Sequence, residues 1–176
     1  VKKAYNAGVE CILKTKISNN GKMTVWCQQH DNTTLLPTNA RTFEPAAICN
    51  GESAEIVEFL MSINNPSEQI INAIENAVNW FEESKIEGIR VKTIQADTVH
   101  YKYSTMTTDR IIEKDVNAPT IWARYYDLNT LKPIFCNRDG HIVNSFEEVD
   151  RERRAGYGWY TYSPTEVLEK YKNWKM

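Results

Sequence analysis

The apolar residues of this chain follow the spacing of an α-helix in three stretches. Their side chains recur at intervals of three and four residues, which places them on one face of a helix. The pattern predicts helices over 1–17, 51–63 and 65–84. Because the first apolar stripe already includes Val1, we expect the chain to begin inside a structural element, as a fragment or processed product would.

Three short sequences carry the signal of a helix start, a polar capping residue followed three positions later by glutamate. They are NPSE at 65–68, SFEE at 145–148 and SPTE at 163–166. The first opens the helix that runs to about residue 84. The second predicts a helix that ends at Gly156, and the third predicts the last helix of the chain.

The connections between these helices are long and contain short apolar runs. Alternating residues predict a strand over 23–27, after an Asn-Gly hairpin signal, and a second strand over 121–126. Residues 28–50 read as loop, and the polar tract 97–118 reads as a long loop or insertion. We therefore predict a mainly α chain with short strands in its connections. Because these connections are long, a helical toroid fits better than a four-helix bundle.

Composition narrows the choice of partner. The chain has 176 residues, which suits one domain or a large part of one, with 41% apolar residues and a net charge of −2. This acidic balance, without a lysine-rich stripe, argues against a nucleic-acid-binding domain. No apolar run approaches the roughly 18 residues of a membrane span. Five of the eight arginines fall within 124–154, which indicates a local anion site.

Cysteines and histidines do not form a recognisable metal or redox motif. The four cysteines lack CxxC spacing, and their even number allows two disulfides in three connectivities, although we expect free buried thiols. The three histidines are too scattered for a metal cluster, so we expect structural roles for them. These residues are Cys11, Cys27, Cys49, Cys136, His30, His100 and His141.

Arginines beside aromatic residues recur in the last third of the chain, at Arg124, Arg138 and Arg153. A guanidinium group binds a carboxylate through two parallel hydrogen bonds, so such a ladder suits a polymer with a carboxylate on each sugar. The alternative is a set of structural salt bridges, which the spacing alone favours. Its acidic partners would be Glu147, Glu148, Asp150 and Glu152.

Five motifs in register resemble one known family. They are TVWCQQHD (24–31), ARTFE (40–44), WARYY (122–126), PIFCNRDG (133–140) and ERRAGYGWY (152–160). In this order they resemble the family 10 polysaccharide lyases, which are pectate lyases with an irregular (α/α)3 toroid. The resemblance covers most of residues 1–176, corresponds to about the second half of the catalytic domain, and is weak only over 97–118.

The resemblance implies a secreted enzyme that cleaves α-1,4-polygalacturonate by calcium-assisted β-elimination. Arg41 resembles the catalytic base, and Arg124, Arg138 and Arg153 resemble arginines that hold substrate carboxylates. The family's calcium ligands lie largely in the earlier half of the domain, so no metal ligand is predicted in this chain. A missing N-terminal half or a second copy would then complete the cleft.

An arginine base needs a special setting, because arginine normally stays protonated. Burial, neighbouring cations or an alkaline medium would favour its neutral form. The alternative to the enzyme is a non-catalytic module that binds acidic polysaccharide through the same arginines and aromatic residues.

Overall fold

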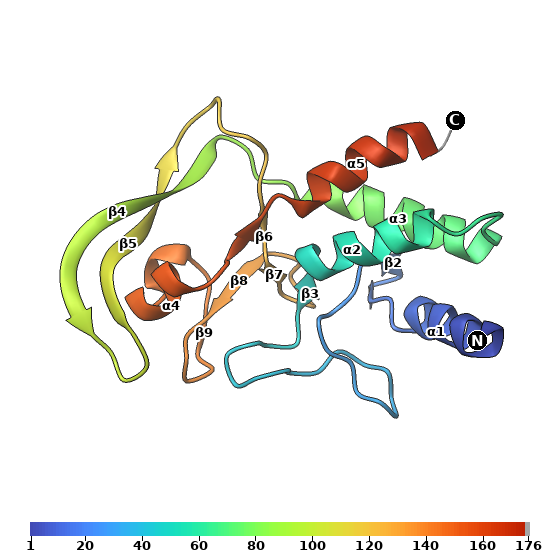
Figure 1. Ribbon diagram of the computed structural model, residues 1–176, viewed down its shortest axis with the longest axis horizontal. Helices are drawn as coiled ribbons and strands as arrows, with labels where there is room; N and C mark the ends of the chain where they lie inside the picture. Colours follow the sequence, from blue (N-terminus) through green and yellow to red (C-terminus); the bar gives the residue numbers. More distant parts are fainter. Residues whose placement is uncertain (175–176) are drawn as a thin grey trace.

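The four longer helices gather on the right of Figure 1, and the long two-stranded hairpin lies on the left with one short helix inside its curve. The computed structural model describes residues 1–174. The helices are α1 (Lys2–Lys14), α2 (Asn50–Met61), α3 (Glu68–Ser84), the 3₁₀ turn η1 (Phe146–Glu148), α4 (Arg151–Gly156) and α5 (Ser163–Trp174). The strands are β1 (Ser18–Asn19), β2 (Lys22–Met23), β3 (Ile48–Cys49), β4 (Ile89–His100), β5 (Thr105–Lys114), β6 (Trp122–Ala123), β7 (Tyr125–Tyr126), β8 (Pro133–Cys136), β9 (Ile142–Val143) and β10 (Tyr160–Thr161).

The prediction of a mainly α chain is wrong. The structure is 36% helical and 25% strand, and its strands form several antiparallel sheets. A four-stranded sheet, in the order β3-β7-β8-β9, occupies the centre. The helices do not plainly form a toroid, and the connections between them contain more paired strand than we expected.

The largest correction concerns residues 97–118, which we expected to form a loop or insertion. Most of them belong to a long antiparallel hairpin, in which Ile89 pairs with Lys114 and His100 with Thr105. The hairpin curves around α4 in Figure 1, and its side chains are exposed or half-buried. None of residues 97–114 is fully buried, so this mostly polar part lacks the clear apolar alternation that predicts a strand.

The helix predictions hold with shifted boundaries. The predicted helices over 1–17, 51–63 and 65–84 correspond to α1, α2 and α3, but Ser67 caps α3 by accepting from the backbone N–H of Ile70. Asn65, the expected cap, instead takes a positive φ of 51°. The SFEE capping box forms but opens only η1, and α4 begins separately at Arg151. The SPTE sequence starts α5 as predicted.

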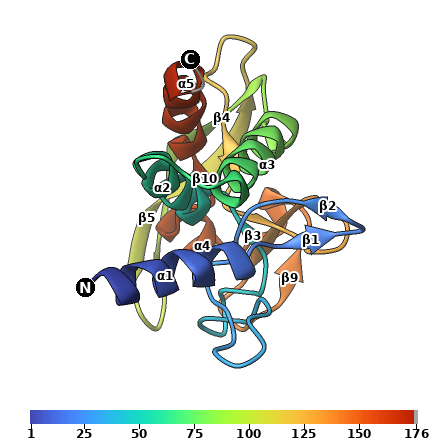
Figure 2. The same cartoon turned by 90° about the vertical axis from the view of Figure 1, so that its right-hand side faces the viewer.

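Of the predicted first strand over 23–27, only Met23 belongs to a strand, at the end of β2. Residues 24–27 are all buried instead of alternating between core and solvent. Helices α2, α3 and α5 pack against one another, with α1 lying below them in Figure 2. In residues 1–174, none of the helices is both long enough and apolar enough to cross a lipid bilayer.

Two hydrophobic cores meet at the paired strands β3 and β7. Ile48 faces Tyr126 across this pair, and both side chains enter the core that the helices cover. Cys49 faces Tyr125, and these two enter a second core beneath β8, η1 and β10. Successive side chains of a strand point to opposite faces. The two residues of β3, and likewise those of β7, therefore contribute one side chain to each core. The four predicted arginines lie beside the second core.

Candidate active site

The loop between Cys27 and β3 positions Arg41 and Phe43 against the loop that carries Arg138. A turn closes at Glu44, whose backbone N–H donates to the carbonyl of Arg41 at 2.8 Å. Gly140 permits the approach of the second loop. It has a φ of +93°, and a Cβ atom there would lie 3.0 Å from the carbonyl oxygen of Thr42. A larger residue would push the two loops apart.

Three of the four predicted arginines share the ring of Phe43. The guanidinium carbon lies 5.0 Å from the ring centroid for Arg41, 5.3 Å for Arg138 and 4.5 Å for Arg153. These distances are typical of cation–π contacts. The aromatic ring therefore holds three cationic side chains from three separate segments in one place.

Arg124 joins the same group through Tyr157. Its guanidinium carbon lies 5.0 Å from the Tyr157 ring centroid, and that of Arg153 lies 3.9 Å from it. We call Arg41, Arg124, Arg138 and Arg153 the arginine cluster. The structure thus brings together all four arginines that the sequence singled out.

Three members of the cluster are paired with glutamates. Arg41 binds Glu44, Arg124 binds Glu52, and Arg138 binds Glu152 with 2.7 Å between Nε and Oε2. Of the four acids that the salt-bridge alternative named, only Glu152 contacts a cluster arginine through its carboxylate. That alternative is therefore correct for one pair, and the other two pairs involve acids elsewhere in the chain.

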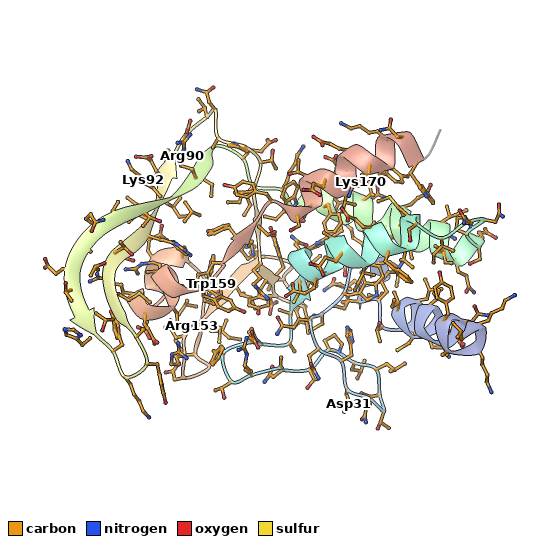
Figure 3. All side chains as sticks on the ribbon, viewed as in Figure 1. Asp31, Arg90, Lys92, Arg153, Trp159 and Lys170 are labelled. Carbon is orange, nitrogen blue, oxygen red and sulfur yellow. The ribbon has the colours of Figure 1, made fainter. Side chains whose placement is uncertain are left out.

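Arg153 is the cluster member without a carboxylate partner among the described residues. It is only 4% exposed and lies between the rings of Phe43 and Tyr157. Figure 3 shows it beside Trp159, whose centroid is 5.1 Å from the guanidinium carbon. Burial lowers the pKa of Arg153, and the nearby charge of Arg138 acts in the same direction. The side chain is thus a buried cation that aromatic faces stabilise.

Arg41 is the most exposed member, with 64% of its side chain accessible, whereas Glu44 is 3% exposed. Both carboxylate oxygens of Glu44 accept from the guanidinium, and Oε1 also accepts from the Tyr157 hydroxyl at 3.0 Å. The hydrogen bond from Arg41 lowers the pKa of Glu44 to about 2. The same bond raises the pKa of Arg41, which opposes loss of its proton.

Gln28 and two tyrosines connect Arg124 to this pair. The Gln28 Oε1 atom accepts from the hydroxyl of Tyr125 at 3.0 Å and lies 3.4 Å from Nη2 of Arg124. The two tyrosine hydroxyls, of Tyr125 and Tyr157, lie 2.8 Å apart. Burial raises the pKa of Tyr125, so its hydroxyl stays neutral. Close polar contacts through Gln28, Tyr125 and Tyr157 therefore form a network from Arg124 to Glu44.

The tip of the β4–β5 hairpin borders the cluster. Tyr103, which is 65% exposed, lies with its ring centroid 5.3 Å from the guanidinium carbon of Arg138. The hydroxyl of Ser104 lies 3.5 Å from Oε1 of Glu152. The segment that we expected to be an insertion therefore forms one edge of the candidate site.

Helix α4 presents its arginines in two directions. Arg151 and Arg154 lie three positions apart and share a helix face, which is turned to the hairpin. Arg154 binds both carboxylate oxygens of Asp109, at 2.9 and 2.6 Å, and Arg151 donates to the carbonyl of Asp97 at 2.7 Å. The intervening Arg153 points the other way, toward the other three arginines of the cluster. One short helix therefore attaches the hairpin and supplies the buried cation.

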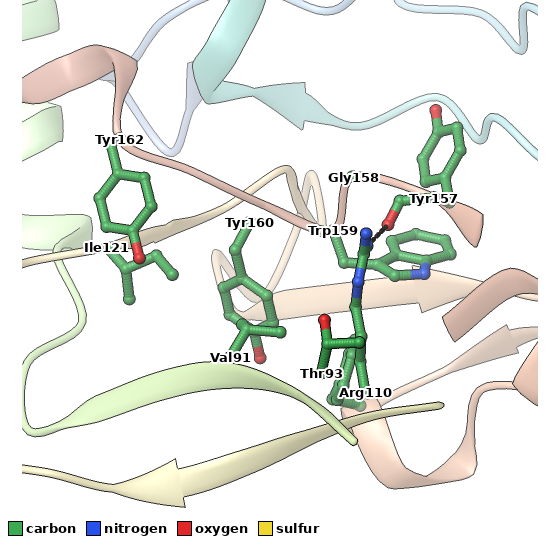
Figure 4. A pocket seen from close by; sticks show the side chains of 10 residues that line it. Val91, Thr93, Arg110, Ile121, Tyr157, Gly158, Trp159, Tyr160 and Tyr162 are labelled. Carbon is green, nitrogen blue, oxygen red and sulfur yellow. Dashed lines mark hydrogen bonds between the residues drawn. The ribbon is translucent and has the colours of Figure 1, made fainter. Parts of the chain in front are cut away.

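A separate cavity of about 230 Å³ lies between the hairpin and residues 157–162 (Figure 4). Arg110 crosses it and donates to the carbonyl of Tyr157 at 2.8 Å. The cavity is lined by aromatic rings, including Tyr160 and Tyr162.

Within residues 1–174, no group of three or more histidine, cysteine, aspartate or glutamate side chains is arranged to hold a metal ion. The acids nearest the cluster, Glu44, Glu52 and Glu152, are each engaged by an arginine. These residues do not fit a calcium site.

Sequence reasoning missed most of the residues that surround the four arginines. Phe43, Glu44, Gln28 and Tyr157 stand inside the quoted motifs, so the motifs themselves carried the signal. Glu52 lies outside them, 72 positions from its partner Arg124. No local pattern indicates such a distant pair.

Comparisons with known proteins identify a family and two similar solved structures. The family model for pectic acid lyase matches residues 1–168. Two solved structures are similar to the chain: a family 10 polysaccharide lyase from Cellvibrio cellulosa, and a point mutant of it in complex with trigalacturonic acid. Each is 30% identical with a TM-score of 0.82, and the match covers 98% of this chain and 50% of the other. A comparison with curated proteins gives no match.

The chain thus spans about half the length of the solved lyases that it resembles. The resemblance inferred from the five motifs is confirmed by a family match over nearly the whole sequence. The chain belongs to the pectic acid lyase family.

Proposed function

We propose that this chain forms the arginine-bearing part of a pectate lyase that cleaves α-1,4-polygalacturonate by β-elimination. The observation that carries the proposal is the convergence of Arg41, Arg124, Arg138 and Arg153 on the rings of Phe43 and Tyr157. Four cations gathered at one place suit a substrate with a carboxylate on each sugar. Since this polymer belongs to the plant cell wall, we also propose that the protein is secreted.

The chemistry explains why cations are needed. Elimination removes the proton at C5 of galacturonate and breaks the bond between C4 and the glycosidic oxygen. The adjacent carboxylate opposes deprotonation because it is already negative. Guanidinium groups that bind this carboxylate stabilise the charge that develops in the transition state.

Arg138 is best placed to bind a substrate carboxylate. Only its Nε atom is engaged by Glu152, and 38% of its side chain is exposed. Its terminal nitrogens therefore remain available as donors. Arg124 provides a second position at the other end of the network, and Arg153 supports both from beneath by fixing Phe43 and Tyr157.

Arg41 is proposed as the base, and Glu44 sets the condition under which it can act. The pair with Glu44 raises the pKa of Arg41. Deprotonation therefore requires that Glu44 leave Arg41 in the substrate complex, or that the medium be alkaline. Tyr157 offers Glu44 an alternative partner, because its hydroxyl already donates to Oε1.

Calcium assistance is proposed only with ligands outside the described residues, since the acids near the cluster do not fit a calcium site. A preceding part of the protein or a second copy would supply them. The roles derived above depend on the arginines alone.

The test is formation of unsaturated product from polygalacturonate in the presence of calcium, followed by the ultraviolet absorbance of the new double bond. The assay uses a protein that contains the whole cleft, that is, this chain together with the part that supplies the calcium ligands. We expect product from the wild-type form of that protein and almost none from its Arg41→Lys variant. The control is Arg90→Lys on the hairpin, where Arg90 pairs with Asp115 and does not contact the cluster. Product formation by Arg41→Lys at the wild-type rate would contradict the assignment of the base.

A second candidate function is a non-catalytic module that binds acidic polysaccharide. It is favoured by the coverage of only 50% of the related lyases. Binding of trigalacturonate by the wild-type chain without any product would support this function over the enzyme.

A further inference from the structure

Two cysteines stand at the two ends of the loop that carries Arg41, Phe43 and Glu44. Cys27 precedes the loop and Cys49 follows it in β3. The backbone N–H of Cys49 donates to the carbonyl of Trp26 at 2.8 Å, directly beside Cys27. Such a bond holds two backbone segments at about the spacing of neighbouring strands, roughly 5 Å. A disulfide spans alpha carbons that are about 4.4–6.8 Å apart.

The side chains also meet. Both residues are buried, and each thiol donates to a nearby backbone carbonyl, Cys27 to Thr38 at 3.8 Å and Cys49 to Ala47 at 3.5 Å. The pKa of each thiol responds to the other, Cys27 downward and Cys49 upward. The other two cysteines are elsewhere: Cys11 is exposed on α1, contrary to the expectation of buried thiols, and Cys136 is buried in β8. All four are free thiols, as expected from the sequence.

We propose that Cys27 and Cys49 form a disulfide under oxidising conditions and thereby close the loop 28–48 covalently. The proposal is independent of the proposed activity, because it depends only on the backbone bond that holds the segment of Cys49 beside that of Cys27 and on the burial of both side chains. Its consequence for the candidate site is direct, since the closed loop holds Arg41 and Glu44.

The oxidant would be a low-molecular-weight disulfide such as oxidised glutathione. The Cys27 thiolate attacks one of its sulfur atoms, forms a mixed disulfide and releases one thiol. Cys49 then loses its proton, attacks the Cys27 sulfur and releases the second thiol. The two protein thiols are oxidised, and the small disulfide is reduced to two thiols.

Exposure and pKa both favour this order. Interaction with the other cysteine lowers the pKa of Cys27, which supplies the attacking thiolate, and raises that of Cys49. Cys49 is completely buried, whereas Cys27 retains a small exposed area. Cys27 is therefore the sulfur that an external disulfide reaches first.

The experiment is refolding of the full chain in a mixture of reduced and oxidised glutathione, followed by alkylation, proteolysis and mass spectrometry. We expect one pair of linked peptides, containing Cys27 and Cys49, with Cys11 and Cys136 alkylated. Alkylation of both Cys27 and Cys49, or a link from Cys27 to either other cysteine, would overturn the proposal.

Thermal unfolding provides a second readout. Closing a loop of this length should raise the melting temperature of the oxidised chain above that of the reduced chain by roughly 6–12 °C. The matched control Cys11→Ser should keep this difference, and Cys27→Ser should abolish it. Equal melting temperatures of linked and reduced wild-type chain would show that the bond does not constrain the native loop, and would overturn the proposed consequence for the site.

Discussion

At the scale of single residues, Arg153 shows how a buried cation is accommodated without a carboxylate. Its planar guanidinium lies against Phe43 and Tyr157, and its N–H groups point to the carbonyls of Cys136 and Phe43 at 3.5 and 3.4 Å. Arginine suits this place because it stacks on rings and is weakly hydrated. Its predicted role in holding substrate stays a prediction, and its burial favours a supporting position.

Arg153→Lys should destabilise the chain by about 1–3 kcal/mol, because a compact, strongly hydrated ammonium cannot stack in the same slot. Chemical denaturation would measure the change in the free energy of unfolding. Arg90→Lys, an exposed ion-paired position, serves as the control and should change stability by less than about 0.5 kcal/mol. Equal effects at both positions would contradict this account of Arg153.

Glu44 gives a prediction about pH. Its pKa is about 2 in the folded chain, below its value in the unfolded chain. The stabilisation is therefore present above about pH 4.3 and is lost as the pH falls toward 2. Between about pH 7 and about pH 3 the free energy of unfolding falls in both proteins. We expect this fall to be about 1–2 kcal/mol smaller in Glu44→Gln than in the wild type. Glu55→Gln, an exposed position on α2, should behave like the wild type.

Denaturation curves at the two pH values would measure this difference. An unchanged pH dependence in Glu44→Gln would mean that the Arg41–Glu44 pair does not stabilise the folded chain.

The identities of the four arginines could be predicted from the sequence, because each stands in one of the five motifs. Their acidic partners could not be predicted in the same way, since Glu52 and Gln28 meet Arg124 only through the fold.

At the scale of elements, the β4–β5 hairpin is attached to the body through α4. Arg154 binds Asp109, and Arg151 donates to main-chain carbonyls of both strands. The sequence predicted the end of α4 at Gly156, but the helix begins at Arg151 and not at the capping box, which opens only η1. It did not predict the hairpin, whose strands are largely solvated and are held by ion pairs and backbone bonds.

A double-mutant cycle on Arg154→Met and Asp109→Asn tests this attachment. We expect a coupling energy of about 1–3 kcal/mol, because the pair is largely shielded from water and bidentate. The exposed pair Lys92–Glu113, on the same hairpin, should give less than about 1 kcal/mol. A coupling at Arg154–Asp109 no larger than that of the exposed pair would show that this contact does not hold the hairpin.

At the scale of the whole molecule, two cores share the strands β3 and β7, and the arginine cluster lies against the second core at Phe43 and Tyr157. The sequence identified the family correctly and the architecture incorrectly. Family motifs concentrate at the site, where chemistry restricts the residues, so they remain visible. The short strands of the connections are specified by distant partners, so two or four residues of each carry too little pattern to be recognised.

The central claim is that the arginine cluster binds the carboxylates of a galacturonate polymer. Calorimetric titration with trigalacturonate tests it most directly, in the wild-type chain, in Arg138→Met and in the control Arg90→Met. We predict that Arg138→Met raises the dissociation constant roughly 10- to 100-fold through loss of a charge-assisted pair. Arg90→Met should stay within about twofold of the wild type. Unchanged affinity in Arg138→Met, or the same loss in Arg90→Met, would contradict the account.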